Sequence, residues 1–321
     1  MTTIGILGLG LIGGSFALTA ERVGHQVVAW DADGVTREEA GTRGLTVSPD
    51  LSAAELIVLA VPMPALTERL ATTLAEVDVS SDATITDVGS LKQPVAAAMH
   101  AAGLAERYVG GHPMAGTERS GFQAASPDLF TGASWALCLD PDDPVPVDRW
   151  LRAAAVVTDL GAGVVPITPV EHDEAMAMVS GLPHLLALAL SAAAESSAPV
   201  VRSLTAGSFA DLTRVAGSGP ALLHAVTRQN APAVRAALRL VLDQLDRPWE
   251  DLIRSGHEAR QSWPSGGSAG KRPSPEPQSA VPNAQQLLEL GRAGTVIEAV
   301  DLAAGLIGLR RMTPPGRTSG G

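Results

Sequence analysis

The sequence predicts an α/β domain followed by an all-helical domain, and three observations support this. The chain of 321 residues is long enough for two domains. Its first half alternates short apolar runs, rich in Val and Ile, with helical segments, which is typical of a mostly parallel sheet covered on both faces. After Pro169 the chain is rich in Ala, Leu and Met and shows no strand signal of comparable quality. We therefore expect one domain over residues 1–168 and a second over residues 169–321.

The expected elements follow from the local pattern in chain order. Strand-like runs cover residues 3–7, 26–30, 56–61, 84–87, 108–111, 135–139 and 164–167. Helical patterns cover residues 170–197, 200–215, 220–229, 232–246 and 283–310. Pro183 should kink the first of these helices, because proline lacks a backbone N–H and clashes with the preceding turn. Residues 262–282 contain five prolines among Ser and Gly, so we expect a flexible excursion there.

Composition and charge exclude several classes of protein. The net charge is −11 and no long basic run occurs, which argues against a nucleic acid partner. The single cysteine, Cys138, cannot form an intramolecular disulfide, which fits a reducing compartment. The longest apolar stretch, residues 185–194, is too short to span a bilayer, and the N-terminus has no secretory pattern. We expect a cytoplasmic protein that binds neither nucleic acid nor membrane.

A glycine motif follows the first expected strand. Gly8-Leu9-Gly10-Leu11-Ile12-Gly13 connects that strand to a helix, which is the context that makes this motif indicate a Rossmann-type dinucleotide-binding turn. Gly8 allows the tight turn, Gly10 lets the backbone approach a pyrophosphate, and Gly13 lets the helix pack on the sheet. Leu11 and Ile12 open the helix, whose positive end would face the phosphates.

An acidic residue follows the second strand at the spacing of a ribose-binding carboxylate. Asp31 lies 18 residues after the last glycine of the motif. A carboxylate there accepts from the ribose hydroxyls and repels a 2′-phosphate, so we expect NAD rather than NADP. Asp33 is a rival carboxylate, and Arg37 could attract a 2′-phosphate. We also expect the backbone of Val61 and Pro62, after the third strand, to line the cofactor.

Polar residues at two further strand ends are candidates for the chemistry, since ligands of open α/β sheets lie beyond the carboxyl ends of the strands. Glycines precede His112 and a proline follows it, so the backbone is constrained, and the ordinary pKa of His near 6.5 suits proton transfer. Ser90 can hydrogen-bond a hydroxyl or orient an imidazole. The alternative is that His112 is a loop histidine with no partner.

The helical half holds a second group of candidates. Ser180 and His184 are four residues apart and share a helix face. Arg214 lies in a stretch poor in charge and suits bidentate binding of a carboxylate, although a surface pair with Asp211 is equally compatible. His172, like the remaining histidines, has no comparable context, and we expect it to be a structural or surface residue.

Together these motifs resemble the prephenate/arogenate dehydrogenase family of tyrosine biosynthesis, over residues 4 to 246. The landmarks are residues 8–13, 87–92, 111–118, 171–173, 180–184 and 211–214. The resemblance implies an N-terminal dinucleotide-binding domain and a C-terminal helical domain that holds substrate and dimerises. It therefore implies a homodimer that acts on a small molecule.

The resemblance also implies roles for individual residues. His112 would hydrogen-bond the ring hydroxyl of the substrate and accept its proton, Ser90 would support that hydroxyl and the histidine, and Arg214 would bind a substrate carboxylate. Further positions that match the substrate pocket are Ser180, His184, Thr117, Glu118 and Gly207. We assign no metal to the site.

The expected reaction is NAD-dependent oxidative decarboxylation of prephenate to 4-hydroxyphenylpyruvate. Gly219 and Leu223 stand where the family often has Asp and Trp, and Gly181 stands where relatives often have another His. Arogenate carries an ammonium in place of the keto group of prephenate and would favour a nearby carboxylate. Because Gly219 removes one such acid and His184 suits a keto acid, we favour prephenate.

Three alternatives remain open at this point. Arogenate dehydrogenase is the alternative within the family. A β-hydroxyacid or imine reductase would need a catalytic lysine in the helical domain, and the only lysine after Lys92 is Lys271, within the segment expected to be flexible. A non-catalytic NAD-binding regulator is the alternative from a different class, and binding without turnover would identify it.

Overall fold

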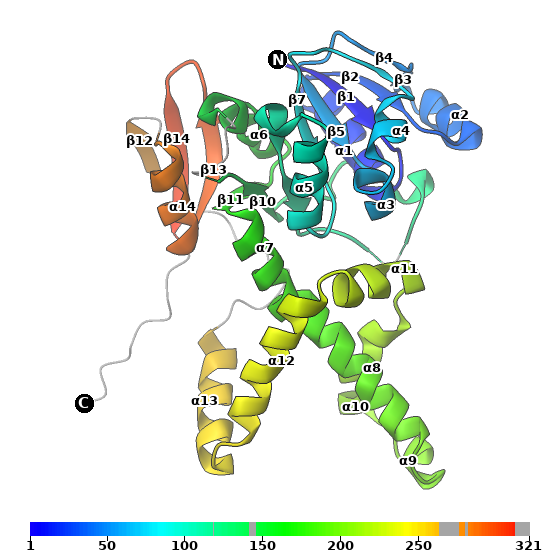
Figure 1. Ribbon diagram of the computed structural model, residues 1–321, viewed down its shortest axis with the longest axis vertical. Coiled ribbons are helices and arrows are strands. Elements are labelled where there is room, and N and C mark those ends of the chain that lie inside the picture. The colour runs from blue at the N-terminus through cyan, green and yellow to red at the C-terminus, as the bar shows by residue number, and fades with distance from the viewer. Residues whose placement is uncertain (118, 141–145, 263–275, 280–281, 312–321) are drawn as a thin grey trace. The chain divides into compact units, whose positions relative to one another are not determined.

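The structure, a computed structural model, is shown in Figure 1 and describes the chain except residues 118, 141–145, 263–275, 280–281 and 312–321. The chain divides into two compact units. The first unit combines residues 1–172 with the described part of 269–312, and the second comprises the described part of 173–268. The C-terminal segment therefore joins the first unit, whereas the sequence prediction assigned it to the second domain.

The first unit contains a six-stranded parallel sheet in the order β3-β2-β1-β5-β7-β8. Its strands are β1 (Thr3–Leu7), β2 (Gln26–Trp30), β3 (Thr46–Val47), β5 (Leu56–Leu59), β7 (Thr84–Asp87) and β8 (Tyr108–Val109). The first unit also contains a short parallel pair of strands, β4 (Asp50–Leu51) and β6 (Asp78–Val79). The order of the large sheet reverses between β1 and β5, so their carboxyl ends flank a topological switch point.

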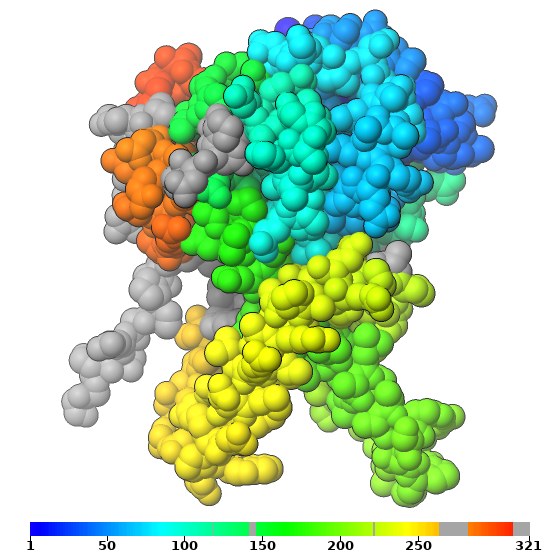
Figure 2. All heavy atoms as spheres, viewed as in Figure 1, coloured from blue at the N-terminus to red at the C-terminus, as the bar shows by residue number. Residues whose placement is uncertain are grey.

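Helices cover both faces of this sheet. They are α1 (Leu11–Arg22), α2 (Gly34–Thr42), α3 (Met63–Leu66), α4 (Leu70–Leu74), α5 (Gln93–Ala101) and α6 (Val147–Asp159). Neighbouring residues of β1 point to opposite faces: Ile6 belongs to a core cluster with Phe16 of α1, and Leu7 belongs to a second cluster with Leu66 and Met99. In Figure 2 the cyan residues of α3, α4 and α5 form one continuous surface.

The chain passes from this sheet into a second one at Gly110. The single strand expected over residues 108–111 is in fact two strands, β8 and β9 (Gly111–Pro113). A Cβ at Gly110 would lie 3.1 Å from the Tyr108 hydroxyl, so a side chain would crowd this crossing. Strand β9 pairs antiparallel with β10 (Ser134–Cys138), and β10 pairs parallel with β11 (Gly163–Ile167). The crossing thereby places His112 on the second sheet, opposite Ala136.

The C-terminal segment completes the second sheet, in the order β12-β14-β13-β11-β10-β9. Its elements are β12 (Glu276–Ser279), α14 (Ala284–Arg292), β13 (Thr295–Asp301) and β14 (Leu306–Arg311). The helix expected over residues 283–310 is therefore wrong beyond Arg292. Gly294, at φ +71°, follows the helix, and the β-branched run after it pairs with β11. A Cβ at Gly291 would lie 1.8 Å from the Pro166 carbonyl oxygen, so α14 packs directly on β11.

The flexible excursion expected over residues 262–282 is only partly within the described residues. Glu276–Ser279 forms β12, which pairs antiparallel with β14, and Ser262 ends helix α13. Residues 263–275 and 280–281 lie outside the described residues. The prediction of a flexible segment is therefore wrong for the strand β12.

The second unit is helical throughout its described residues. Its elements are α7 (Pro169–Met176, which begins in the first unit), η3 (Ala177–Gly181), α8 (Leu182–Glu195), α9 (Val200–Ser203), α10 (Gly207–Thr213), η4 (Arg214–Gly217), α11 (Pro220–Leu223), η5 (His224–Arg228), α12 (Ala231–Leu245) and α13 (Trp249–Ser262). Helix η3 is a π-helical turn that lies directly before Pro183. Because Pro183 lacks an N–H, the regular α-helical hydrogen bonding is interrupted in the turn before it.

Within the described residues, one helical run, Pro169–Glu195, is long and apolar enough by length and composition to cross a membrane. It is longer than the apolar stretch at residues 185–194 on which the sequence argument depended. A single run of this kind is weak support for a membrane span, because a core helix of a water-soluble protein passes the same test. Only 22% of the most apolar window of this helical run is buried within one chain. Packing in the core of a single chain therefore does not explain the apolar side chains that the run exposes.

Candidate active site

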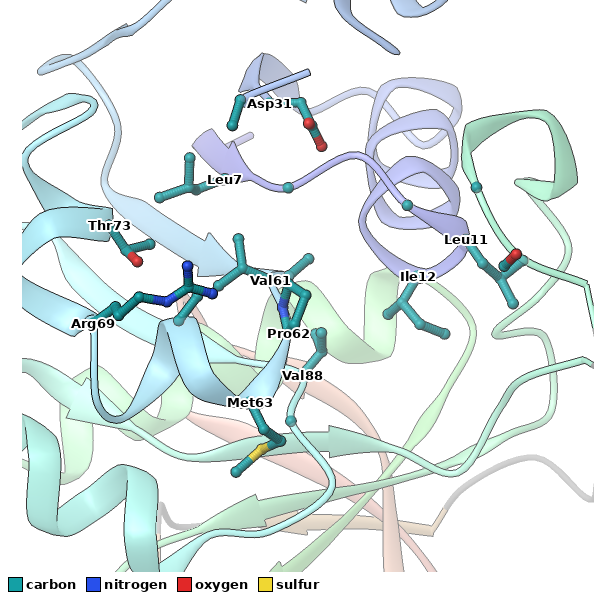
Figure 3. Close-up of a pocket in the computed structure, with 18 of the residues that line it drawn as sticks. Leu7, Leu11, Ile12, Asp31, Val61, Pro62, Met63, Arg69, Thr73 and Val88 are labelled. Atoms are coloured by element: carbon teal, nitrogen blue, oxygen red, sulfur yellow. The ribbon is translucent and has the colours of Figure 1, made fainter. Parts of the chain in front are cut away.

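A cleft of about 730 Å³ lies at the switch point of the parallel sheet, between the ends of β1 and β5 (Figure 3). Eight of the residues predicted from sequence line it: Gly8, Gly10, Leu11, Ile12, Asp31, Val61, Pro62 and Ser90. Met63, which follows Pro62 in the stretch expected to line the cofactor, also lines the cleft, whereas the sequence reasoning missed Arg69 and Thr73, the residue before α4 and a residue of α4. Figure 3 shows the Arg69 guanidinium directed toward Val61.

The three glycines of the motif occupy different environments. Gly8 has φ +98°, and a Cβ there would lie 2.4 Å from the Ala60 carbonyl oxygen. A Cβ at Gly13 would lie 2.0 Å from the Gly8 carbonyl oxygen, so Gly13 allows α1 to pack against the turn and does not itself line the cleft. At Gly10 no described atom lies within 4 Å of an added Cβ. Gly10 therefore faces open space in the cleft, which leaves its backbone accessible to a phosphate.

The first turn of α1 has unsatisfied donors that suit an anion. Gly10 is the N-cap of α1 and provides no side-chain hydrogen bond to the first-turn N–H groups. These N–H groups and the helix dipole favour negative charge at this end of the helix. The glycine turn and the start of α1 together fit the pyrophosphate of a dinucleotide.

Asp31 is held rigidly at the rim of this cleft. Its Oδ2 accepts from the Leu9 N–H at 2.7 Å, and its Oδ1 accepts from the Asp33 N–H at 2.8 Å. A carboxylate has about four acceptor positions, so Asp31 can still accept from ribose hydroxyls. The rival Asp33 caps α2 by accepting from the Thr36 N–H at 2.8 Å. Asp31 lines the cleft, whereas Asp33 is not among its lining residues.

Arg37 is engaged with the chain itself. Its Nη1 donates to the carbonyl oxygens of Asp31 at 2.6 Å and Ala32 at 2.8 Å. Its guanidinium lies 4.3 Å from the ring centroid of Trp30, within the range of a cation–π interaction. Through these contacts Arg37 supports the loop that carries Asp31.

Gly10 and Gly13 should respond differently to the same substitution. We expect Gly13→Ala to lower the free energy of unfolding by about 1–3 kcal/mol, because its Cβ would press on the Gly8 carbonyl. Gly10→Ala should leave the Tm unchanged and weaken dinucleotide binding by about tenfold, because its methyl group would occupy space that a phosphate needs. Thermal melts and fluorescence titration with the dinucleotide measure both effects. Equal loss of stability in both variants would contradict this assignment.

A buried ionic cluster fixes the backbone on both sides of Gly111, the residue before His112. Asp87, at the end of β7, accepts from the Gly111 N–H at 3.1 Å and from the Tyr108 hydroxyl at 2.7 Å. Lys92 is paired with Asp87 and donates to the Gly111 carbonyl oxygen at 2.7 Å. Both charged side chains are fully buried. The cluster therefore sets the direction in which β9 presents His112.

His112 has one ring nitrogen engaged. Its Nδ1 lies 2.9 Å from Nε2 of His172, and the two rings meet edge to face with their centroids 5.1 Å apart. Burial, and then the nearby His172 and Lys92, lower the pKa of His112 well below its usual value of 6.5. The imidazole is therefore neutral at neutral pH and can act as a base through Nε2.

His172 is a member of the site that the sequence reasoning passed over. It lies in the first turn of α7 and is fully buried. Its partner His112 is 60 residues away in the chain, so no local spacing connects the two. Two signals were available: its place in the 171–173 landmark of the family resemblance, and its position in the first turn of a helix directly after a buried strand, β11.

The start of α7 is tied to the C-terminal segment. The Glu171 side chain accepts from the Thr168 N–H at 3.0 Å, and Arg292 of α14 donates to it at 2.6 Å. Burial raises the pKa of Glu171, but the hydrogen bonds from Arg292 and Thr168 outweigh this and the net pKa is lowered. The C-terminal segment therefore braces the helical turn that carries His172.

The remaining candidates lie apart from this cluster in the chain. Thr117 is exposed, and its hydroxyl accepts from the Arg119 N–H at 3.2 Å, whereas Glu118 lies outside the described residues. In the second unit, His184 Nδ1 donates to the Ser180 carbonyl oxygen at 2.8 Å, which leaves Nε2 as the acceptor of a neutral ring.

Arg214 and Gly207 are both exposed within the chain, at η4 and at the first residue of α10. Helix α8, which carries His184, packs against both α10 and η4. The second unit therefore brings the predicted substrate residues of that domain onto neighbouring elements. Among the described residues, no group of three or more His, Cys, Asp or Glu side chains could hold a metal ion.

Two family models match consecutive parts of the chain. The first, described as prephenate dehydrogenase, nucleotide-binding domain, matches residues 16–166. The second, described as prephenate dehydrogenase, dimerization domain, matches residues 168–260. The chain belongs to the prephenate dehydrogenase family. This confirms the predicted resemblance and the predicted fold class, a Rossmann-type nucleotide-binding domain followed by a helical domain.

Individual relatives agree on the family and differ in their named substrates. The prephenate dehydrogenase of Lactococcus lactis is 32% identical over 244 residues, which cover 72% of this chain but only 65% of that enzyme. Synechocystis arogenate dehydrogenase has a TM-score of 0.69 at 29% identity, with 81% of this chain and 98% of that chain covered. Prephenate dehydrogenase of Aquifex aeolicus, solved with hydroxyphenyl propionate and NAD+, has the same score and identity, with 81% and 93% covered.

Proposed function

We propose that this protein catalyses the NAD-dependent oxidative decarboxylation of prephenate to 4-hydroxyphenylpyruvate, a step of tyrosine biosynthesis. The observation that carries the proposal is the placement of the His112 imidazole: it follows Gly111, whose backbone is bonded to Asp87 and Lys92, and its Nδ1 is already bonded to His172. Such a residue is a base with one available nitrogen. A dehydrogenation of an alcohol needs a base at the hydroxyl beside a nucleotide that takes the hydride.

Each residue has a defined part in this reaction. NAD, when bound, accepts hydride from the carbinol carbon of the substrate. His112 Nε2 accepts the hydroxyl proton, and it can return that proton to the phenolate oxygen after carbon dioxide leaves and the ring becomes aromatic. Ser90 lines the cleft after β7 and would hydrogen-bond the same hydroxyl. Because aromatisation makes the reaction strongly downhill, the protein mainly positions groups and moves one proton.

NAD is the preferred cofactor in this proposal. Asp31 presents a fixed carboxylate at the position of the ribose, and this charge would repel the 2′-phosphate of NADP. Arg37, the cation that could attract that phosphate, is engaged with backbone carbonyls and with Trp30. The Aquifex aeolicus relative, solved with NAD+, agrees with this preference.

Arg214 is proposed to bind a carboxylate of the substrate. We expect Arg214→Gln to raise KM for prephenate by about tenfold or more, with kcat changed much less, because the contact is made in ground and transition states alike. Steady-state kinetics at saturating NAD measure this effect. Arg228→Gln is the matched control, an exposed arginine of the same unit whose loss should leave KM unchanged. An unchanged KM in Arg214→Gln would remove Arg214 from the substrate site.

Prephenate is preferred to arogenate in this proposal. At Gly219 no described atom lies within 4 Å of an added Cβ, so the position where the family often has an acid provides none here. An ammonium group would then lack that carboxylate, whereas His184 Nε2 and its ring suit a keto acid. The Synechocystis relative is an arogenate dehydrogenase, so arogenate is the substrate to test against.

We also propose that the protein is a cytoplasmic homodimer. The helical unit exposes many large apolar side chains: Val179, Leu186, Val200, Leu204, Leu212, Leu240, Leu242, Leu245, Trp249 and Ile253. Soluble monomers rarely leave so much apolar surface uncovered, and a second copy would cover it. The description of the second family model as a dimerization domain supports this reading. Cys138, the single cysteine of the sequence, is buried and cannot form an intramolecular disulfide, which fits a reducing compartment.

One comparison of rates tests the proposed function. Purified protein is assayed for reduced cofactor at 340 nm with prephenate or arogenate, each with NAD or NADP. The expected result is the highest kcat/KM with prephenate and NAD. A higher value with arogenate would assign the protein to the other branch of the family. NAD binding without turnover of either substrate would identify a non-catalytic binding protein and overturn the proposal.

A further inference from the structure

We propose that His172 is a positioning residue that holds His112 in the one neutral tautomer able to act as a base. The proposal rests on the proposed function, because only a proton-abstracting His112 needs that tautomer. It starts from the contact of His112 Nδ1 with His172 Nε2 at 2.9 Å.

The geometry determines where each proton must lie. A hydrogen bond between two ring nitrogens needs one protonated and one unprotonated atom. When His112 is to accept a proton at Nε2, its own proton must be on Nδ1, so Nδ1–H donates and His172 Nε2 accepts. His172 is then neutral with its proton on Nδ1. The opposite arrangement would place the His112 proton on Nε2 and block the base.

Two features keep His172 neutral and therefore able to accept. It is fully buried, and burial disfavours the charged imidazolium. It also lies in the first turn of α7, where the helix dipole disfavours positive charge. The buried cation Lys92, beside His112, acts in the same direction. Of the two acidic residues that flank His172 in the chain, Glu171 is paired with Arg292, and Asp173 is buried.

The contact also has a favourable consequence during the reaction. When His112 gains a proton at Nε2, its Nδ1–H becomes a charged donor, and a hydrogen bond to a charged group is about twice as strong as a neutral one. His172 therefore stabilises the product of proton transfer more than the resting state. The contact with His172 therefore raises kcat and leaves substrate binding largely unchanged.

Two substitutions separate this role from packing. In His172→Gln the amide oxygen can reach the position of Nε2 and still accept from His112 Nδ1–H. In His172→Phe the ring volume is kept but the acceptor is lost. We expect His172→Phe to lower kcat by about 10- to 100-fold, as for other partners that orient a histidine, with KM nearly unchanged. His172→Gln should recover most of kcat, and His100→Gln, on the exposed face of α5, should behave as wild type.

Nitrogen NMR of protein with ¹⁵N-labelled histidine, without substrate and at pH 8, reads the tautomer directly. The His112 resonances are assigned by their loss in His112→Asn. We expect Nδ1 of His112 to carry the proton in wild type and in His172→Gln, and to lose this preference in His172→Phe.

The proposal is overturned if wild-type His112 carries its proton on Nε2, or if His172→Phe keeps wild-type kcat. If both variants fail to fold, the wild-type spectrum alone decides. Absence of turnover in wild type would reject the proposed function, and it would leave the spectroscopic result as a separate finding about the histidine pair.

Discussion

Replacement of His112 by Asn should lower kcat by about 10²–10⁴-fold and leave KM nearly unchanged. Asn keeps a polar group near the position of Nδ1, which contacts His172, but it has no titratable nitrogen at the position of Nε2. The loss corresponds to removal of general-base assistance, which has this typical magnitude. Steady-state kinetics with prephenate and NAD measure it. Wild-type turnover in this variant would remove His112 from the mechanism.

Two further measurements accompany this variant. His112 is not among the residues that line the nucleotide cleft, so the Kd for NAD should match wild type. The pH profile of the wild type provides the second check. Because burial, His172 and Lys92 lower the pKa of His112, the neutral base persists below pH 6.5, and kcat/KM should fall only at lower pH. An acidic limb above pH 6.5 would contradict a neutral, buried base.

Lys92→Met should lower the free energy of unfolding by about 3–5 kcal/mol. The substitution leaves the buried Asp87 carboxylate without its cation and removes a donor from the Gly111 carbonyl oxygen. Breaking a buried ion pair by removing one partner has this cost because the remaining charge is uncompensated. Thermal melts should show a fall in Tm on the order of 10 °C.

Two controls test the cause of this destabilisation. The double variant Asp87→Asn/Lys92→Met removes both charges and should recover part of the lost stability. Arg152→Met breaks an ion pair with Asp148 in which both side chains are more than half exposed, and it should change stability by less than about 1 kcal/mol. A loss in Lys92→Met no larger than that in Arg152→Met would show that the buried pair does not support the fold.

Much of the first unit could be predicted because its signals are local. The glycine turn, the short apolar strands and Asp31 each depend on residues close together in the chain, and the structure brings them to one cleft. Beyond Arg292 the C-terminal segment was predicted wrongly as a helix, since residues 295–301 make a strand only by pairing with β11 and β14. Strand pairing is a non-local interaction, and propensity alone does not reveal it.

The residues of the candidate site also fall into those that local sequence could identify and those that only the folded structure brings together. His112 could be singled out from its glycine and proline neighbours. The cluster that supports its backbone could not, because Asp87, Lys92 and Tyr108 meet beside Gly111, the residue before it, only after β7, β8 and β9 have assembled. Arg214 lies in a stretch poor in charge, yet the structure shows it exposed within one chain, which the sequence pattern did not indicate.

The sequence by itself determined the family, the nucleotide-binding turn and the residue that we propose as the base. These depend on backbone geometry and on residue types that are set within about ten residues of chain. Only the tertiary structure decided how that base is prepared. The contact between His112 and His172 joins residues 60 positions apart, and it exists because β9 and the start of α7 are folded against each other. A tautomer is selected by such a contact, and neither histidine specifies it alone.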